Sequence, residues 1–180
     1  MINVVASRYA EALFQIGEDE KITDKLYEEL SEITKLFNEC KEFYSVLKSP
    51  VISKKEKLSL IDNIIEDKVN INLKNFLKLL IEKNRISFIH DISYSYKELL
   101  NEKYNVIEGV VITAIPMNEK EIKELEEKLS QKYNKNVTLE NKVDKSILGG
   151  VLVRLGNEEI DGTVKNRLDK IKEQLSQVIS

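Results

Sequence analysis

The sequence predicts an α+β protein, with an N-terminal six-helix bundle over residues 1–105 and a small βαββα domain over residues 106–180. Three observations lead to this expectation. Apolar residues recur at intervals of three and four from Val4 to Tyr104, the spacing of amphipathic helices. Just after Tyr104 the interval changes to two, as half-buried strands require. A strand-turn-strand pattern in residues 137–156 then leads into a last amphipathic helix.

The first predicted helix covers Val4 to Gly17, because glycine favours a helix end. In the next segment, residues 21–48, one apolar stripe alternates intervals of four and three. A dimeric coiled coil is one interpretation of this stripe. Packing inside the bundle is favoured, because Leu36 and Phe43 widen the stripe beyond a narrow seam. A break near residues 38–41 divides this segment into two helices and gives six in total.

The remaining helices of this domain have recognisable start signals. Ser53 and Glu56 form a capping-box pattern, in which the serine accepts a bond from a free amide and the glutamate reaches back. Asn72 is the expected cap of a helix over Leu73–Lys83, which is apolar nearly all round. Such a helix must be covered on more than one side. Ser87 is the expected cap of the last helix of the bundle.

The C-terminal domain begins with a predicted strand over Val106–Ile115. Asn118 and Glu121 give the cap signal of the helix that follows. Residues 137–143 alternate apolar and polar side chains, whereas the segment 148–156 is apolar on both faces at Val151, Leu152 and Val153. A polar turn between these two segments predicts a hairpin. An amphipathic helix then completes the βαββα order.

Gly149 and Gly150 lie inside the second strand pattern of this hairpin. Glycine weakens a strand interior unless the backbone bulges or another element approaches closely, so we expect a bulge or a packing contact. A phosphate-binding loop is the alternative. It is disfavoured because no Lys-Ser or Lys-Thr follows at the P-loop spacing and no third glycine completes a dinucleotide-binding motif.

The composition is ordinary for a soluble globular protein, with 42% hydrophobic and 33% charged residues. Basic and acidic residues number 28 and 31 and are well mixed, so the sequence offers no basic patch for nucleic acid. We expect neither secretion nor direct membrane insertion, because the N-terminus lacks a signal-peptide pattern and no apolar run approaches about 18 residues. Cys40 lies on an apolar helical stripe and is expected to be a buried structural thiol in a reducing compartment.

No pattern in the sequence indicates catalysis. His90 has no second histidine or cysteine nearby for a metal site, and its expected place is the first turn of a helix. The acidic pairs Glu28-Glu29 and Glu126-Glu127 fit solvated helix faces. We therefore expect no catalytic residue, no cofactor and no metal, in a protein that is not an enzyme. The alternative is a small enzyme with a site assembled across the domains. A deep pocket with convergent polar groups would support that alternative.

Several motifs carry a resemblance to a known family. In the C-terminal half the pattern is apolar at Val137, Leu139, Val143 and Ile147, acidic at Asp144, small at Gly149 and Gly150, apolar at Val151 and Val153, and polar at Arg154 before Gly156. Further along, the chain is similar to an Asp-Gly-Ser-x-Lys-x-Arg-Leu ending, with Thr163 in place of serine: Asp161-Gly162-Thr163-Val164-Lys165-Asn166-Arg167-Leu168. The N-terminal pieces are Arg8-Tyr9-Ala10-Glu11-Ala12-Leu13-Phe14, Ser49-Pro50-Val51-Ile52 followed by Lys57, Asn75-Phe76-Leu77-x-Leu79-Leu80, and Asn84-Arg85. Over nearly its whole length the chain therefore resembles the delta subunit of bacterial F-type ATP synthases, called the oligomycin-sensitivity-conferring protein in mitochondria.

The resemblance implies a non-catalytic connector that links the catalytic head to the peripheral stalk and resists rotor torque during proton-driven ATP synthesis. It implies that the helical domain binds the N-terminal helix of an alpha subunit in an apolar groove between its first and fifth helices. The expected groove residues are Tyr9, Ala12, Leu13, Phe76, Leu79 and Leu80.

The resemblance also implies that the C-terminal domain contacts the C-terminal end of a b subunit. The expected contact residues are Gly149, Gly150, Val151, Arg154 and Leu168. The expected location is peripheral, on the cytoplasmic face of the bacterial cell membrane, through the ATP synthase complex. The alternative is a generic helical adaptor or scaffold subunit of another multiprotein complex. Self-association of the protein through residues 21–48 would favour that alternative.

Overall fold

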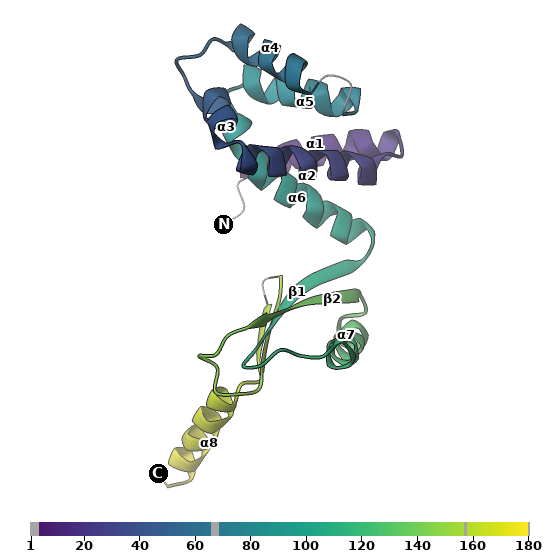
Figure 1. The fold of residues 1–180 in the computed structure, drawn as a ribbon. Helices are drawn as coiled ribbons and strands as arrows, with labels where there is room; N and C mark the ends of the chain where they lie inside the picture. Colours follow the sequence, from purple (N-terminus) through teal and green to yellow (C-terminus); the bar gives the residue numbers. More distant parts are fainter. Residues whose placement is uncertain (1–3, 66–68, 157, 180) are drawn as a thin grey trace. The chain divides into compact units, whose positions relative to one another are not determined.

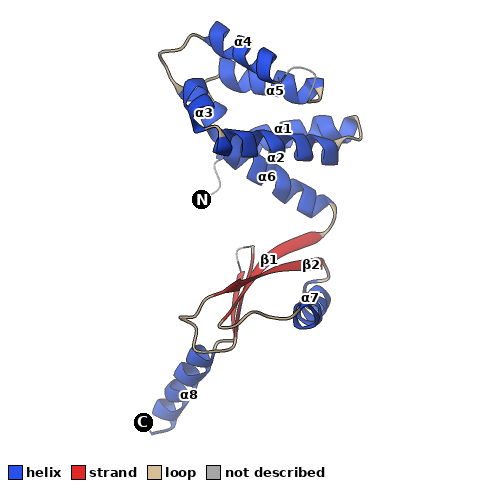
Figure 2. Ribbon diagram, viewed as in Figure 1, coloured by secondary structure: helices blue, strands red, loops and turns tan. Residues whose placement is uncertain are grey.

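The chain divides into two compact units, Met1–Leu100 and Asn101–Ser180, a few residues before the predicted boundary (Figure 1). The computed structural model describes residues 4–65, 69–156 and 158–179, and the side chains of the last helix as far as Lys172. Helices dominate the first unit, whereas every strand lies in the second (Figure 2). The predicted α+β class is therefore confirmed.

The described residues of the N-terminal part form six α-helices and one short 3-10 helix. They are α1 (Val4–Asp19), α2 (Thr23–Glu39), α3 (Lys41–Lys48), α4 (Lys54–Ile64), α5 (Ile71–Glu82), η1 (Ile86–Phe88) and α6 (Ile89–Lys103). One apolar core joins these helices, and its fully buried members include Leu13, Leu26, Phe37, Leu80 and Tyr96. Except for Cys40, the long apolar stripe of residues 21–48 packs into this core, so the protein uses it within its own fold.

The break predicted near residues 38–41 is confirmed, because α2 ends at Glu39 and α3 begins at Lys41. Cys40 joins the two helices and is exposed, so the prediction of a buried thiol was wrong. The reason is that the break removes Cys40 from the helical stripe on which its predicted burial depended.

Gly17 does not end α1, as the sequence suggested, but lies buried within it. A Cβ atom at this position would lie 3.0 Å from the Tyr96 hydroxyl and 3.1 Å from a methyl group of Leu26. Both contacts are tighter than ordinary van der Waals packing. The glycine therefore allows α1 to approach α2 and α6 closely.

The capping box of Ser53 and Glu56 is confirmed at the start of α4. The cap of α5 is Asn70 rather than Asn72, and its side chain accepts a hydrogen bond of 2.8 Å from the Asn72 amide. Ser87 also differs from expectation, because it lies within η1 just before α6. These two errors arise where several candidate caps stand close together in the sequence.

The part of the C-terminal unit that the structure describes forms a four-stranded mixed sheet and two helices. Its elements are β1 (Val106–Thr113), α7 (Glu119–Tyr133), β2 (Asn136–Val143), β3 (Val151–Leu155), β4 (Glu158–Asp161) and α8 (Val164–Ile179). The order is therefore βαβββα, and the predicted βαββα order missed β4. Acidic residues fill most of this short edge strand, so it has little apolar alternation to reveal it.

The predicted hairpin between β2 and β3 is wrong, because the strand order in the sheet is β2-β1-β3-β4. β1 pairs with β2 in parallel and with β3 in the antiparallel sense. A parallel pair needs a crossover, which α7 provides. Alternation along a chain identifies a strand but does not identify its neighbours, and this is why the pairing was missed.

The helix α7 covers one edge of the sheet as well as part of its core. The Asn118–Glu121 capping box at its start is confirmed. The amide of Val137 donates to the Ser130 hydroxyl at 2.9 Å, and the amide of Leu139 donates to the Glu126 carboxylate at 2.7 Å. The prediction that Glu126 is a freely solvated acid was therefore wrong. Its carboxylate accepts a hydrogen bond from a backbone amide of the edge strand β2, which protects this edge from pairing with another strand.

Gly149 and Gly150 lie in the turn before β3 rather than within the strand. Gly150 has a φ angle of +86°, and a Cβ atom there would lie 2.5 Å from the carbonyl oxygen of Gly162 and 2.8 Å from the Cα atom of Thr163. The predicted packing contact is therefore confirmed. Only glycine combines this backbone conformation with so close an approach.

The segment that begins at Asp161 forms the start of α8. The carboxylate of Asp161 accepts a hydrogen bond of 2.9 Å from the Thr163 amide, and the Thr163 hydroxyl accepts one of 3.3 Å from the Asn166 amide. Hydrogen bonding by Thr163 lowers the pKa of the Asp161 carboxyl. Together with the backbone bond from Val164 to Gly149, these contacts fix the first turn of α8 against the glycine turn.

Candidate functional site

A groove with a volume of about 650 Å³ lies between α1 and α5. Its lining residues are Arg8, Tyr9, Ala12, Leu13, Ile16, Asn72, Asn75, Phe76, Leu79 and Arg85. On each helix they recur at intervals of three and four, so each helix turns one continuous stripe toward the groove. Most of the surface that these residues offer is apolar.

The two helices run in opposite directions along the groove. Tyr9, in the first half of α1, contacts Phe76 in the middle of α5 and Arg85 just beyond the end of α5. Glu20, just after α1, contacts Asn72 in the first turn of α5. The groove therefore has two distinct ends, one at Tyr9 and Arg85 and the other at Glu20 and Asn72.

Buried side chains form the floor of the groove and partly exposed ones form its walls. Leu13 is fully buried and Phe76 is 7% exposed. The Tyr9 and Phe76 rings meet edge to face, with centroids 6.1 Å apart. In contrast, Ile16 and Leu79 are 41% and 40% exposed, although both are large and aliphatic. Apolar side chains left open on facing walls are typical of a surface that a partner covers.

The structure brings five of the six predicted groove residues to this groove: Tyr9, Ala12, Leu13, Phe76 and Leu79. Leu80 is fully buried in the core and does not line it. One residue of sequence rotates a helical side chain by about 100°, which places Leu79 on the wall and Leu80 inside. The sequence reasoning missed the polar rim residues, although the helical interval from Tyr9 and Leu13 also pointed to Ile16.

Two arginines mark the first end of the groove. Arg85 donates a hydrogen bond of 2.8 Å from its guanidinium to the Tyr9 hydroxyl, and its guanidinium carbon lies 5.3 Å from the centroid of that ring. These contacts hold the Tyr9 ring in place beside Phe76. Arg8 is exposed and lines the groove at the same end.

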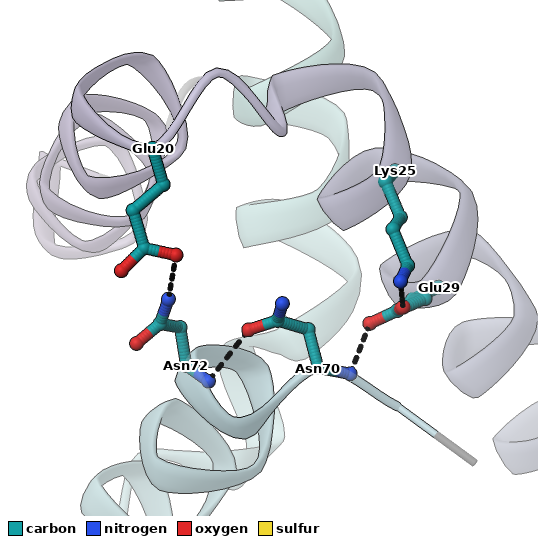
Figure 3. A network of polar contacts seen from close by, with 5 residues as sticks. All are labelled: Glu20, Lys25, Glu29, Asn70 and Asn72. Carbon is teal, nitrogen blue, oxygen red and sulfur yellow. Dashed lines mark hydrogen bonds and ion pairs between the residues drawn. The ribbon is translucent and has the colours of Figure 1, made fainter.

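A polar network closes the second end (Figure 3). Glu20 accepts a hydrogen bond of 2.7 Å from the Asn72 side chain, and Glu29 accepts one of 2.7 Å from the Asn70 amide. Lys25 lies 3.8 Å from the Glu29 carboxylate. Glu29 is 8% exposed, so its predicted place on a solvated face was wrong. Two carboxylates thus face the amide-rich start of α5, where negative charge is favourable.

The predicted stalk-contact residues occupy different settings in the C-terminal unit. Gly149 and Gly150 form the turn against α8, and Val151 is half-buried in β3. Arg154 is exposed and lies directly opposite Glu159 of β4, to which its Nε atom donates at 2.7 Å. Of the five, Leu168 is the large apolar residue left most open, at 50% exposure.

Leu168 belongs to a short exposed stripe on α8. Val164 and Ile171 are 42% and 51% exposed and stand four residues before it and three after it. At this spacing the three side chains lie on one face of the helix. The sequence analysis named Leu168 as an expected contact residue, and Val164 and Ile171 follow from it by the helical interval.

The described residues offer little else for chemistry. None of them forms a group of three or more acidic, histidine or cysteine side chains that would hold a metal ion. His90 stands edge to face against Tyr44, with ring centroids 5.4 Å apart, which is a packing role. Among the described helices, none combines the length and the apolar character that a membrane crossing requires.

Comparison with known proteins gives a consistent result along the whole chain. The family model described as ATP synthase delta (OSCP) subunit matches residues 5–175. The ATP synthase subunit delta of Clostridioides difficile (strain 630) is 64% identical, with 100% of each chain covered. The ATP synthase subunit delta of Alkaliphilus oremlandii (strain OhILAs) is 41% identical, with 99% of each chain covered.

Solved structures share the fold at low sequence identity. A chain of the Toxoplasma gondii mitochondrial ATP synthase hexamer is 21% identical and superposes with a TM-score of 0.72, covering 96% of this chain and 98% of that one. A chain of the Polytomella F-ATP synthase is 20% identical, with a TM-score of 0.53 over 57% of this chain and 92% of that one. With the family model and the full-length relatives, it follows that this chain belongs to the ATP synthase delta (OSCP) subunit family, which is a structural and not a catalytic part of the enzyme.

Proposed function

We propose that the protein connects the catalytic head of an F-type ATP synthase to its peripheral stalk. Rotary catalysis applies torque to the head, and a stationary link is needed to resist it during proton-driven ATP synthesis. The protein performs this task without cofactor or metal, by binding two partners at once. It is peripheral, held on the cytoplasmic face of the bacterial cell membrane through the complex.

The groove between α1 and α5 is the observation that carries this proposal. From Arg8 to Ile16 its α1 wall extends about 12 Å, which is enough for about two turns of a partner helix. A floor of Leu13 and Phe76 with open walls of Ile16 and Leu79 fits an amphipathic helix that inserts its apolar side chains. The proposed occupant is the N-terminal helix of an alpha subunit, seated on a six-helix bundle that covers residues 1–105.

The second partner is the C-terminal end of a b subunit, which we place on the C-terminal domain, residues 106–180. The exposed stripe of Val164, Leu168 and Ile171 on α8 supports this part of the proposal, because it offers apolar surface on one helix face. Gly149 and Gly150 act indirectly, by fixing the start of α8.

Calorimetric titration of the full chain with a synthetic peptide tests the groove. The peptide corresponds to the N-terminal 25 or so residues of the alpha subunit from the same organism, long enough to exceed the groove by about a factor of three. We expect saturable one-to-one binding. Leu79→Asp places a charge on the apolar wall and should abolish measurable binding while leaving helical content intact.

A matched control is Val51→Asp, which makes the same change at a residue that is 90% exposed and lies outside the groove. Its affinity for the peptide should equal that of the unchanged protein. If Leu79→Asp also binds the peptide normally, the assignment of the alpha subunit to this groove is wrong.

A further inference from the structure

We infer that the groove is polarised by charge, so that it accepts a partner helix in one direction only, with the acidic end of that helix at Arg8 and Arg85. The inference rests on the proposed function, since it concerns how the same groove binds a helix. It adds a specificity that apolar contacts alone do not supply.

The cationic end of the groove consists of Arg8 and Arg85, which are the only charged residues among those that line it. Arg8 is exposed and makes no hydrogen bond or ion pair with any residue in the described part of the chain. Arg85 uses one N–H group on the Tyr9 hydroxyl, and a guanidinium has five such donors. Both side chains therefore have donors available for a carboxylate, which guanidinium binds with good geometry.

The opposite end of the groove is acidic. Glu18, Asp19 and Glu20 follow one another where α1 ends, and all three are exposed. Glu20 contacts Asn72, a lining residue, so this acidic segment adjoins the groove (Figure 3). Lys21 follows them but leaves the segment with an excess of negative charge.

The two ends are far enough apart to act separately. Arg8 and Asp19 are eleven positions apart on α1, or about 16 Å along the helix axis. This distance exceeds the screening length of about 8 Å at physiological ionic strength. A partner helix with acids at one end and bases at the other gains at both ends in one direction and is repelled at both ends in the other.

The expected partner is thus an amphipathic helix of about two to three turns, whose apolar stripe is flanked by a carboxylate at one end. The charges contribute mainly to the direction of binding and to the rate of association, because exposed ion pairs are individually weak. The apolar walls supply most of the affinity.

A charge-reversal cycle tests this inference in the full chain. The probe is the alpha-subunit peptide described above, together with one variant for each of its acidic residues, changed to lysine. We expect Arg8→Glu to weaken binding of the unchanged peptide by about tenfold at low salt, and the effect to shrink as salt is added. One of the lysine variants should bind Arg8→Glu more tightly than the unchanged peptide does, which identifies the acid that meets Arg8.

Lys35→Glu is the control, because it changes the net charge of the protein by the same amount as Arg8→Glu. Lys35 is exposed on α2 and does not line the groove. Equal losses for Lys35→Glu and Arg8→Glu, or no loss for either, would overturn the inference while leaving the groove assignment in place. If none of the lysine-substituted peptides binds Arg8→Glu more tightly than the unchanged peptide does, the inference is likewise overturned. Absence of binding by the unchanged protein would instead overturn the proposed function, and this inference with it.

Discussion

The two units of the molecule differ in how completely they bury their own helices. In the N-terminal unit one core takes residues from all six α-helices, and many of its members have no exposed surface. Among the described residues of the C-terminal unit, the buried core is small, with six members: Val111, Leu129, Val137, Leu139, Val153 and Leu155. Between Val164 and Lys172, α8 is exposed at every position except Asn166, which is half-buried.

This difference gives the two proposed binding surfaces different structural support. The N-terminal groove is built on helices that share one buried core, so we expect it to be formed before a partner arrives and binding to cost little ordering. The exposed stripe on α8 does not rest on a comparable buried core. The helix α8 is held to the sheet through the turn at Gly149 and Gly150 and through the hydrogen bonds of Asp161 at its start. We therefore expect changes in the core to act on the stability of the first unit, and changes at the turn to act on the second.

The largest effect is expected for Leu80→Ala in the N-terminal core. Leu80 is fully buried, so its truncation should lower the free energy of unfolding by about 3 kcal/mol. Leu79→Ala is the matched change one residue away, where 40% exposure predicts a loss below about 1 kcal/mol. Urea denaturation of both variants measures the difference, and equal losses would contradict the division between wall and core.

A second, smaller effect is expected for Gly150→Ala in the C-terminal unit. The new methyl group would meet the Gly162 carbonyl in a backbone conformation with φ of +86°, so we expect a loss of about 2 kcal/mol. Gly156→Ala is the control, because φ is also positive there, at +55°, but no atom lies within 4 Å of the added group. Its loss should be about 1 kcal/mol.

Thermal denaturation compares these two glycine variants, and binding of the alpha-subunit peptide reports on the first unit. Peptide affinity should be the same in both. A larger loss of stability for Gly156→Ala than for Gly150→Ala would show that the close approach at the turn is not what requires glycine.

The smallest effect is a pH dependence at the start of α8. The pKa of Asp161 is lowered by its hydrogen bonds from Thr163, so its carboxylate stabilises the folded state above the unfolded pKa of about 3.8. This contribution is lost as the pH falls through the lower, folded-state pKa. Asp161→Asn keeps an acceptor oxygen but removes the charge, and should flatten this part of the pH profile. An unchanged profile between pH 5 and about 2 would rule out this role.

Features that depend on neighbouring residues were predictable from the sequence. The capping boxes at Ser53 and Asn118 and the break before Lys41 each follow from a few adjacent side chains. The strand order was not predictable, because β1 pairs on both sides with segments distant in sequence. The exposure of Cys40 and the burial of Glu29 depend in the same way on where helices end and which helix lies opposite.

The candidate groove was predictable in its apolar part but not at its rim. The resemblance indicated which two helices form it and gave six groove residues, of which Tyr9, Ala12, Leu13, Phe76 and Leu79 line the groove and Leu80 does not. Arg8 and Arg85 were present in the same motifs, yet their gathering at one end follows from the antiparallel packing of α1 and α5. Spacing along one helix does not reveal such packing.

Hydrogen exchange of the full chain, with and without the alpha-subunit peptide, tests the central claim most directly. If a preformed groove between α1 and α5 receives this helix, the peptide should slow exchange in these two helices and leave the sheet of the C-terminal unit unchanged. Protection confined to α8 or to the sheet, with α1 and α5 unaffected, would contradict the account.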